Sequence, residues 1–235
     1  MQNACQKRYF ITISVFGLLL FSCIEKPKGY YQGISEGEIL YNITYPQEIE
    51  SHDFSFIYPK EMTLYFKDNY QRLSFKGSMG MYYFDFIYGD KHDTVFTLMK
   101  IALMDKRLYA TTYGENLLIF SEAPSNMELE ITDETKEIAG TIAKKAVLKS
   151  PFSEISNIEA WYSDSISIKS PNQNTPFNQI QGVLLESEIT YKDVKFIFKA
   201  HKITSKQMSD EIFKVPAEYK ITSISEIAEL LNTVF

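Results

Sequence analysis

The sequence predicts a mainly β (α+β) fold: a strongly curved antiparallel sheet or half-open β-barrel of about ten strands, with helices on the concave face and a C-terminal helix. Strand-length segments that alternate apolar and polar residues follow one another along most of the chain. The connections between them are short, which favours antiparallel pairing. The 235 residues include 16 Tyr and 17 Phe, and aromatic residues favour strands. Because a sheet of this size curls, splits or closes, we expect strong curvature.

The first half of the chain has the pattern of a meander of hairpins. Gly37 to Tyr45 alternates cleanly, and the Asp68-Asn69 pair separates two further alternating segments as a hairpin turn would. Met81–Tyr88 is apolar on both faces except at Asp85, and Thr94–Met104 follows as a second segment that is largely apolar on both faces. We therefore expect both faces of this hairpin to be covered, one by the core and the other by a lid or a ligand. Strands are expected at residues 37–45, 62–66, 71–75, 81–88, 94–104, 107–113 and 117–120.

The second half continues with strands and ends in a helix. Strands are expected at residues 142–148, 155–162, 182–191 and 194–203, with a loop at 171–176 and a short helix at 205–213. A longer helix is expected at 224–234, because Ser223 and Glu226 have the spacing of a capping box. Its apolar stripe consists of Ile227, Leu230, Leu231 and Val234. No internal repeat or second boundary interrupts the chain, so residues 34–235 should form one domain.

The N-terminus has the features of a processing signal. Lys7 and Arg8 precede thirteen residues, 9–21, that lack any charge. That length suits a secretory signal and falls short of the roughly 20 residues that a membrane span needs. The sequence Leu20-Phe21-Ser22-Cys23 resembles the bacterial lipobox, in which the cysteine receives diacylglycerol and becomes the mature N-terminus. An ordinary secreted protein, or an uncleaved N-terminal anchor, is the alternative.

These features divide the chain into a lipoprotein signal peptide at 1–22, a lipidated tether at 23–33 and the folded domain. Cys5 and Cys23 are the only cysteines, so the mature domain has no disulfide and must be stabilised by its core. Hydrophobic residues at 45% and charged residues at 23% argue against a disordered chain. The net charge of −6 argues against nucleic acid as a partner.

Patterns of catalytic or metal-binding residues are missing from the sequence. His52, His92 and His201 are scattered, and neither a zinc-protease motif nor a nucleophile elbow nor a phosphate-binding loop is present. Asp90 to Asp93 fits a solvated hairpin turn, with a weak cation site as the alternative. We therefore expect no catalytic residue, no metal and no cofactor, and a protein that is not an enzyme. A hydrolase with two carboxylates stays open, because such pairs converge only in the fold.

The aromatic residues suggest a binding surface. Tyr82, Phe84, Phe86 and Tyr88 lie on one side of the same expected strand. Such a row either packs a filled core or lines an open apolar cavity, since curved sheets commonly hold hydrophobic ligands. We take these four residues as the candidate ligand-binding residues.

Two tripeptides fit a pattern found in O-glycosylated exported proteins of some Bacteroidetes. They are Asp93-Thr94-Val95 and Asp164-Ser165-Ile166, so Thr94 and Ser165 are candidate glycosylation sites. Short patterns of this kind also occur by chance.

Several short segments together resemble the GLPGLI-type and LolA-like lipoproteins of Bacteroidetes. They are Gly-Glu-Ile-Leu-Tyr at 37–41, Thr-Lys-Glu-Ile-Ala-Gly at 135–140, Glu-Ala-Trp-Tyr-Ser at 159–163, Gln-Ile-Gln-Gly-Val-Leu at 179–184 and Phe-Lys-Val-Pro-Ala-Glu-Tyr at 213–219. Ala143 stands where many relatives have Cys, so no thiol role carries over. Gln179 and Gln181 replace the Gly and Pro of the motif that names the family, which suggests a looser turn.

The resemblance implies a curved sheet or half-open barrel with helices across its concave face, at the periplasmic or cell-surface side of the outer membrane. LolA-like relatives use this cavity for acyl chains, whereas GLPGLI-type relatives have no established activity. We expect a lipid-anchored, non-enzymatic binding module for an apolar ligand or acyl chain. The alternative is an interaction protein of the outer-membrane envelope with a filled core. Its expected partners are a membrane, through the N-terminal lipid, and an apolar ligand or an envelope protein.

Overall fold

The computed structural model describes residues 33–51, 55–89, 93–113, 127–150, 157–173, 175–191 and 194–232. These residues form one curved, open sheet with a C-terminal helix, which confirms the expected fold class. The predicted signal peptide, Cys23, the tether up to residue 32 and the strand expected at 117–120 lie outside the described residues.

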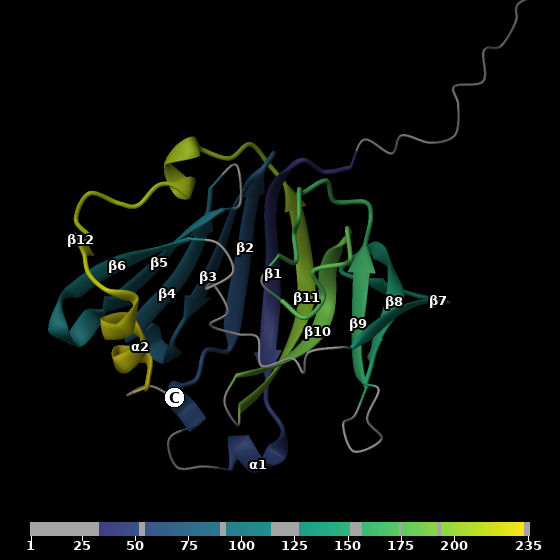
Figure 1. The fold of residues 1–235 in the computed structure, drawn as a ribbon, viewed down its shortest axis with the longest axis horizontal. Coiled ribbons are helices and arrows are strands. Elements are labelled where there is room, and N and C mark those ends of the chain that lie inside the picture. The colour runs from purple at the N-terminus through teal and green to yellow at the C-terminus, as the bar shows by residue number, and fades with distance from the viewer. Residues whose placement is uncertain are drawn as a thin grey trace, which may run out of the picture. The chain divides into compact units, whose positions relative to one another are not determined.

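The described strands and helices are short and closely spaced (Figure 1). The strands are β1 Glu36–Thr44, β2 Glu61–Lys67, β3 Tyr70–Lys76, β4 Tyr82–Tyr88, β5 Thr94–Ile101, β6 Lys106–Tyr113, β7 Glu128–Ile138, β8 Thr141–Lys149, β9 Ile158–Ser163, β10 Val183–Tyr191, β11 Val194–Ser205 and β12 Lys220–Ile221. The α-helices are α1 Gln47–Glu50 and α2 Ile224–Asn232. Short 3₁₀ turns are η1 Ser55–Ile57, η2 Ser78–Gly80, η3 Ala102–Met104 and η5 Asp210–Phe213.

Two meanders join to make the sheet. Its order is β12-β6-β5-β4-β3-β2-β1-β11-β10-β9-β8-β7, so β1 to β6 and β7 to β11 each run consecutively. Neighbouring strands within each meander pair antiparallel, as short connections require. The antiparallel pair of β1 and β11 joins the two halves, and β12 adds to β6 in parallel.

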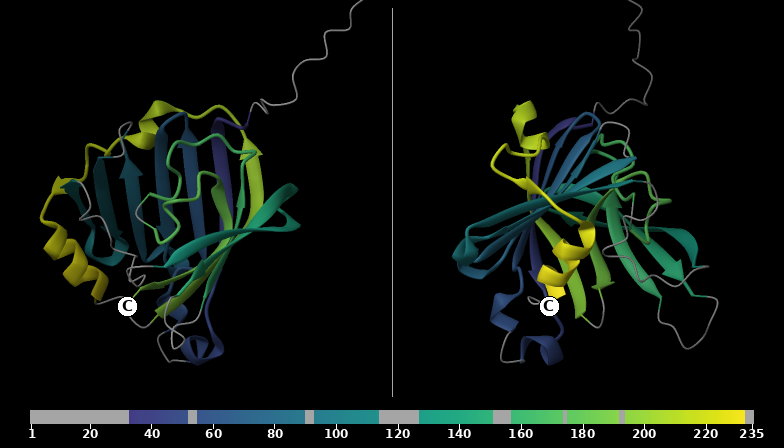
Figure 2. Two further views of the ribbon diagram at one scale, coloured as in Figure 1. Left: turned by 45° about the vertical axis from the view of Figure 1, so that its right-hand side comes forward. Right: turned by 60° about the vertical axis from the view of Figure 1, so that its left-hand side comes forward.

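The concave face carries the main core. Inward residues of β1, such as Ile39 and Ile43, alternate with more exposed ones and are buried with the inward residues of β2, β4, β5, β10 and β11. Ile227 and Leu231 of α2 belong to the same core. Figure 2 shows α2 against the sheet, on the side that carries the connection between β9 and β10.

The β4–β5 hairpin is covered on both faces, as its apolar pattern predicts. Phe84 and Met99 face the concave core. On the opposite face Ile87 and Leu98 are buried against Met208 and other apolar residues of the segment 206–219. This segment connects β11 to β12 and crosses that face of the sheet. The lid that the sequence pattern requires is therefore supplied by the chain itself.

Asp85, the charged residue of β4, lies under that segment. Its Oδ2 accepts a hydrogen bond from Arg72 at 2.8 Å, and a second guanidinium nitrogen of Arg72 donates to the Ile212 carbonyl oxygen at 3.0 Å. Only 3% of the Asp85 side chain is exposed, so this is a buried ion pair that also fastens the segment 206–219 to β3 and β4.

The C-terminal helix begins as its capping pattern predicts, since the Ser223 hydroxyl accepts from the Glu226 backbone N–H at 3.1 Å. The Glu226 carboxylate accepts from the Thr222 side chain. The helix expected at 205–213 is wrong: β11 extends to Ser205, and within 206–213 only η5 is helical. The strand β7 and the helix α1 were not predicted.

Candidate functional site

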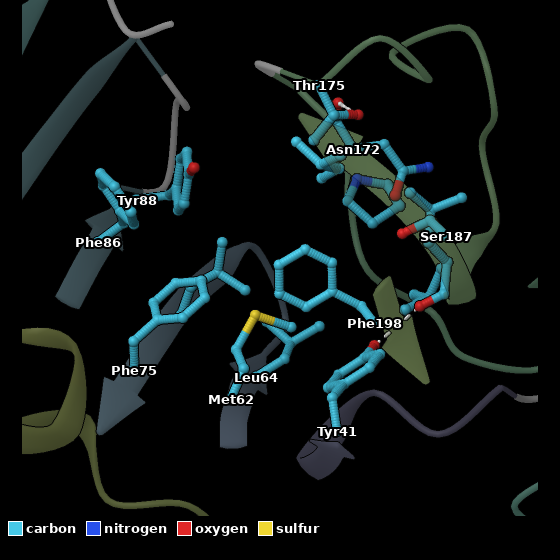
Figure 3. Close-up of a pocket in the computed structure, with 15 residues that line it drawn as sticks. Tyr41, Met62, Leu64, Phe75, Phe86, Tyr88, Asn172, Thr175, Ser187 and Phe198 are labelled. Atoms are coloured by element: carbon cyan, nitrogen blue, oxygen red, sulfur yellow. Dashed lines mark hydrogen bonds between the residues drawn. The ribbon is translucent and has the colours of Figure 1, made fainter. Parts of the chain in front are cut away.

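An apolar pocket opens between the concave face of the sheet and the connection between β9 and β10. Strands β1, β2, β3, β4, β10 and β11 form one wall, and Pro171, Asn172 and Thr175 of the connection contribute the other (Figure 3). Fifteen residues line a cavity of about 90 Å³. A cavity with so small a volume and so many lining residues is narrow.

The sheet side of the pocket is a rigid aromatic and aliphatic wall. The Phe75 ring meets the Phe86 ring at 88° and the Phe198 ring at 76°, with ring centres 6.4 and 6.2 Å apart. Edge-to-face contacts of this kind hold aromatic rings in defined positions. Leu64 and Met62 complete this wall, and both are buried. The wall is therefore formed before any ligand arrives.

The loop side of the pocket is held by Asn172. Its side-chain amide nitrogen donates to the carbonyl oxygens of Ile180 and Gly182, at 2.7 and 2.8 Å. These bonds close the loop from 172 to 182 onto itself, and the Thr175 hydroxyl donates to the Asn172 carbonyl oxygen at 2.8 Å. Both hydrogens of the Asn172 amide take part in these two bonds, so the side-chain oxygen is the group of Asn172 that can accept a hydrogen bond from a ligand.

Two further polar groups lie in the lining. The Tyr41 hydroxyl donates to the Leu184 carbonyl oxygen at 2.8 Å, and burial raises the pKa of Tyr41, so the group stays a neutral donor at physiological pH. Ser187 is 5% exposed, and its hydroxyl has no hydrogen-bond partner among the described residues. Figure 3 shows Ser187 facing the space opposite the Phe86 wall.

The structure divides the four candidate ligand-binding residues into two pairs. Phe86 and Tyr88 line the pocket. Phe84 is buried in the main core, and the Tyr82 hydroxyl donates to the Ile57 carbonyl oxygen at 2.9 Å, away from the pocket. The division arises because the loop covers only the part of the inward face of β4 that ends at Tyr88, whereas β4 itself extends back to Tyr82.

Sequence reasoning missed Asn172 and Ser187. The loop at 171–176 was recognisable as a loop, but its position over β1 to β4, more than eighty residues earlier in the chain, depends on tertiary structure. Ser187 carried a usable signal, because it interrupts an apolar inward row that includes Leu185 and Ile189.

The two candidate glycosylation sites are half-buried. The Thr94 hydroxyl donates to Asp93 Oδ1 at 3.0 Å at the start of β5. The Ser165 hydroxyl lies 2.9 Å from that of Ser163, which is buried. A glycan at Ser165 would have to replace this hydroxyl pair, so Thr94 is the more accessible of the two acceptors.

None of the described residues that line the pocket carries a charged side chain. Over the described parts of the chain, no group of three or more His, Cys, Asp or Glu residues could hold a metal ion. The carboxylate pair that a hydrolase would need does not converge in this pocket. Among the described helices none has the length and apolarity to cross a membrane.

Comparison with known proteins gives a similarity of fold. No family model matches the chain, and no curated protein matches it. Two structures of PNGF-II, in different space groups, are similar at TM-scores of 0.51 and 0.49, each with 14% sequence identity. They cover 85% and 84% of this chain but only 34% and 32% of the PNGF-II chain. The chain thus spans about a third of the length of PNGF-II, and the first of these structures indicates that its fold resembles part of that protein.

Proposed function

We propose that this chain is a lipid-anchored, non-enzymatic binding protein of the outer-membrane envelope, on its periplasmic or cell-surface side, and that its pocket holds a slender apolar ligand such as an acyl chain. The observation that carries the proposal is the preformed apolar wall opposite the hydroxyl of Ser187 and the side-chain oxygen of Asn172. Since no cation or anion lines the pocket, a ligand with a buried charge would lose its hydration without gaining a partner.

The size of the pocket favours a ligand one chain wide. A site for a single water needs ~10–15 Å³, whereas pockets for drug-sized molecules span roughly 300–1,000 Å³. The cavity of about 90 Å³ lies between these limits. A methylene chain is the narrowest apolar ligand, and a neutral hydroxyl or amide at its end would satisfy Ser187 and Asn172.

The same small volume favours the second candidate function, an interaction protein of the envelope with a filled core. In that case the space between the loop and the sheet is a packing gap that holds no ligand. Binding measurements on a matched pair of variants separate the two.

We expect Phe86→Ala and Phe84→Ala to differ in binding although they resemble each other in stability. Both rings are buried, 4% and 3% exposed, so each change should cost about 3–5 kcal/mol. Only Phe86 lines the pocket, so Phe86→Ala should widen it and allow a bulky, environment-sensitive apolar dye to bind more tightly. A fluorescence titration of the full chain, with a long-chain alcohol as competitor, measures this.

The Phe84→Ala variant is the control, because its ring packs against Phe86 at 4.7 Å without reaching the pocket. It should bind the dye as the wild type does. If neither the wild type nor Phe86→Ala binds the dye, the filled-core interaction protein becomes the better proposal.

The lipid anchor is tested at Cys23. Cys23→Ser should abolish fatty-acid labelling, whereas Cys5→Ser should leave it intact, because the first cysteine is removed with the signal peptide. Several acyl chains on one residue hold a membrane stably where a single chain does not. The net charge of −6 over the whole chain gives no overall attraction to an anionic surface. Intact mass of the wild type should exceed that of residues 23–235 by a diacylglyceryl group and a further acyl chain. A mature N-terminus elsewhere, without added lipid mass, would refute the anchor.

A further inference from the structure

Exposed apolar side chains gather on three connections at one end of the sheet. Met79 of η2 is 97% exposed, Leu103 and Met104 of η3 are 87% and 58% exposed, and Phe56 of η1 is 57% exposed. We call these four residues the apolar rim. Because β1 to β6 form a meander, the connections that follow β1, β3 and β5 all lie at the same end, the lower end in Figure 1. The Ala102 backbone N–H donates to the Met81 carbonyl oxygen at 2.8 Å, which places η2 beside η3.

The opposite end of the same strands is different. Its described turn residues are polar, with Asp68 and Asn69 between β2 and β3 and Asp93 before β5. Tyr113, at the end of β6, is 68% exposed but carries a hydroxyl. Single exposed apolar residues are normal on a protein surface, whereas a set on adjacent turns at one end indicates an interaction surface.

The backbone of the turn that carries Met79 has a defined conformation. Met79 has a φ of 53°, in the left-handed region that a residue with a side chain rarely adopts. Gly77 before it has no room for a side chain, since a Cβ would lie 2.3 Å from the Tyr82 ring. The turn is thus packed against β4, and Met79 projects from it into solvent.

The charges beside Met79 and η3 are mostly positive, although the whole chain has a net charge of −6. The two turns are flanked by four basic residues, Lys76, Lys100, Lys106 and Arg107. An acidic residue, Asp105, ends η3 and forms an ion pair with Arg107 at 2.6 Å. Toward Phe56 the charges are mostly acidic instead, with Glu48, Glu50 and Glu61 against Lys60, which lies 3.8 Å from Glu50. Exposed apolar side chains flanked by basic ones match the interface of a bilayer, where apolar groups enter the headgroup boundary and Lys and Arg meet anionic lipid.

We propose that the apolar rim inserts into the interface of an anionic lipid bilayer. The occupant is a lipid surface because the rim consists of exposed side chains on separate turns beside basic residues, and none of the four lines the pocket on the concave face. The contact is separate from the pocket on the concave face, because none of the four rim residues lines that pocket.

The test places a fluorescent reporter at each end of the sheet in the full chain. Met79→Trp and Tyr113→Trp are compared in vesicles of phosphatidylcholine and phosphatidylglycerol whose acyl chains carry bromine, with Trp161 as the common background. We expect bromine to quench the added fluorescence of Met79→Trp and to leave that of Tyr113→Trp unchanged. Quenching at Tyr113→Trp alone, or at neither position, would overturn the proposal.

A second change tests whether the rim itself makes the contact. Adding Leu103→Asp and Met104→Asp to the Met79→Trp chain should remove most of the bromine quenching, because charged groups resist burial in the interface. Both residues are exposed, so Tm should stay unchanged and report an intact fold. Unaltered quenching would contradict insertion. A dimer that forms without lipid and is lost in this variant would instead assign the rim to contact between two copies of the chain.

Discussion

Leu231→Ala should lower the free energy of unfolding by about 2–5 kcal/mol, the cost of removing a large apolar side chain from a packed core. Leu231 is 2% exposed and lies one helical turn from Ile227, which is fully buried. Both belong to the core of the concave face, together with Phe84 and Met99. In a domain of this size the loss corresponds to a fall in Tm of roughly 4–20 °C.

Thermal unfolding followed by circular dichroism measures this effect. The matched control is Glu229→Ala in the same helix, at an exposed position where substitutions usually change stability by ~0.5 kcal/mol or less. Equal Tm values for the two variants would mean that α2 is not docked on the sheet.

Asp85→Ala should destabilise the chain by about 3–5 kcal/mol, because it leaves the Arg72 charge without its partner beneath the segment 206–219. The Asp85 side chain is 3% exposed and that of Arg72 is 18% exposed, so water replaces the lost carboxylate poorly. The effect exceeds that of an exposed ion pair, which contributes ~0–1 kcal/mol.

The double change Asp85→Leu with Arg72→Met should recover most of this loss. Replacing both members of a buried pair by apolar residues of similar size is often neutral or stabilising. Arg72 Nε and Asp85 Oδ1 have no hydrogen-bond partner in the described part of the chain, so the wild-type pair is only partly satisfied. Urea unfolding of the single and double variants tests this account. A double variant as unstable as Asp85→Ala would show that the pair stabilises the fold beyond the penalty of an unpaired charge.

Most of the sheet was predictable from the sequence because one face of each strand packs on a core. The alternation in residues 37–45 corresponds to β1, whose buried and more exposed positions alternate. The strand β7 was missed for the opposite reason. It lies at the edge of the sheet, and among its apolar residues only Ile138 at its end is buried, whereas Ile131 is 50% exposed. An edge strand that buries little has no periodic pattern to detect.

The candidate site was predictable only on its sheet side. Phe86 and Tyr88 were found because the aromatic row of β4 is local in sequence. Asn172 was not, because its role depends on two hydrogen bonds that fold the loop back to Ile180 and Gly182 and on the position of that loop over the sheet. The apolar rim was also missed, since Met79 and Leu103 become neighbours only when β4 and β5 pair.

A crystal structure of the chain with a long-chain alcohol that carries bromine at its tail tests the pocket most directly. The account predicts an anomalous bromine peak beside Phe75 and Phe86, with the alcohol hydroxyl within hydrogen-bond distance of Ser187 or Asn172. Ser187→Leu, which fills the cavity, should remove the peak, whereas Ser205→Leu, at an exposed position of β11, should keep it. An empty pocket at saturating alcohol, or bromine bound only elsewhere on the chain, would contradict the proposed binding function.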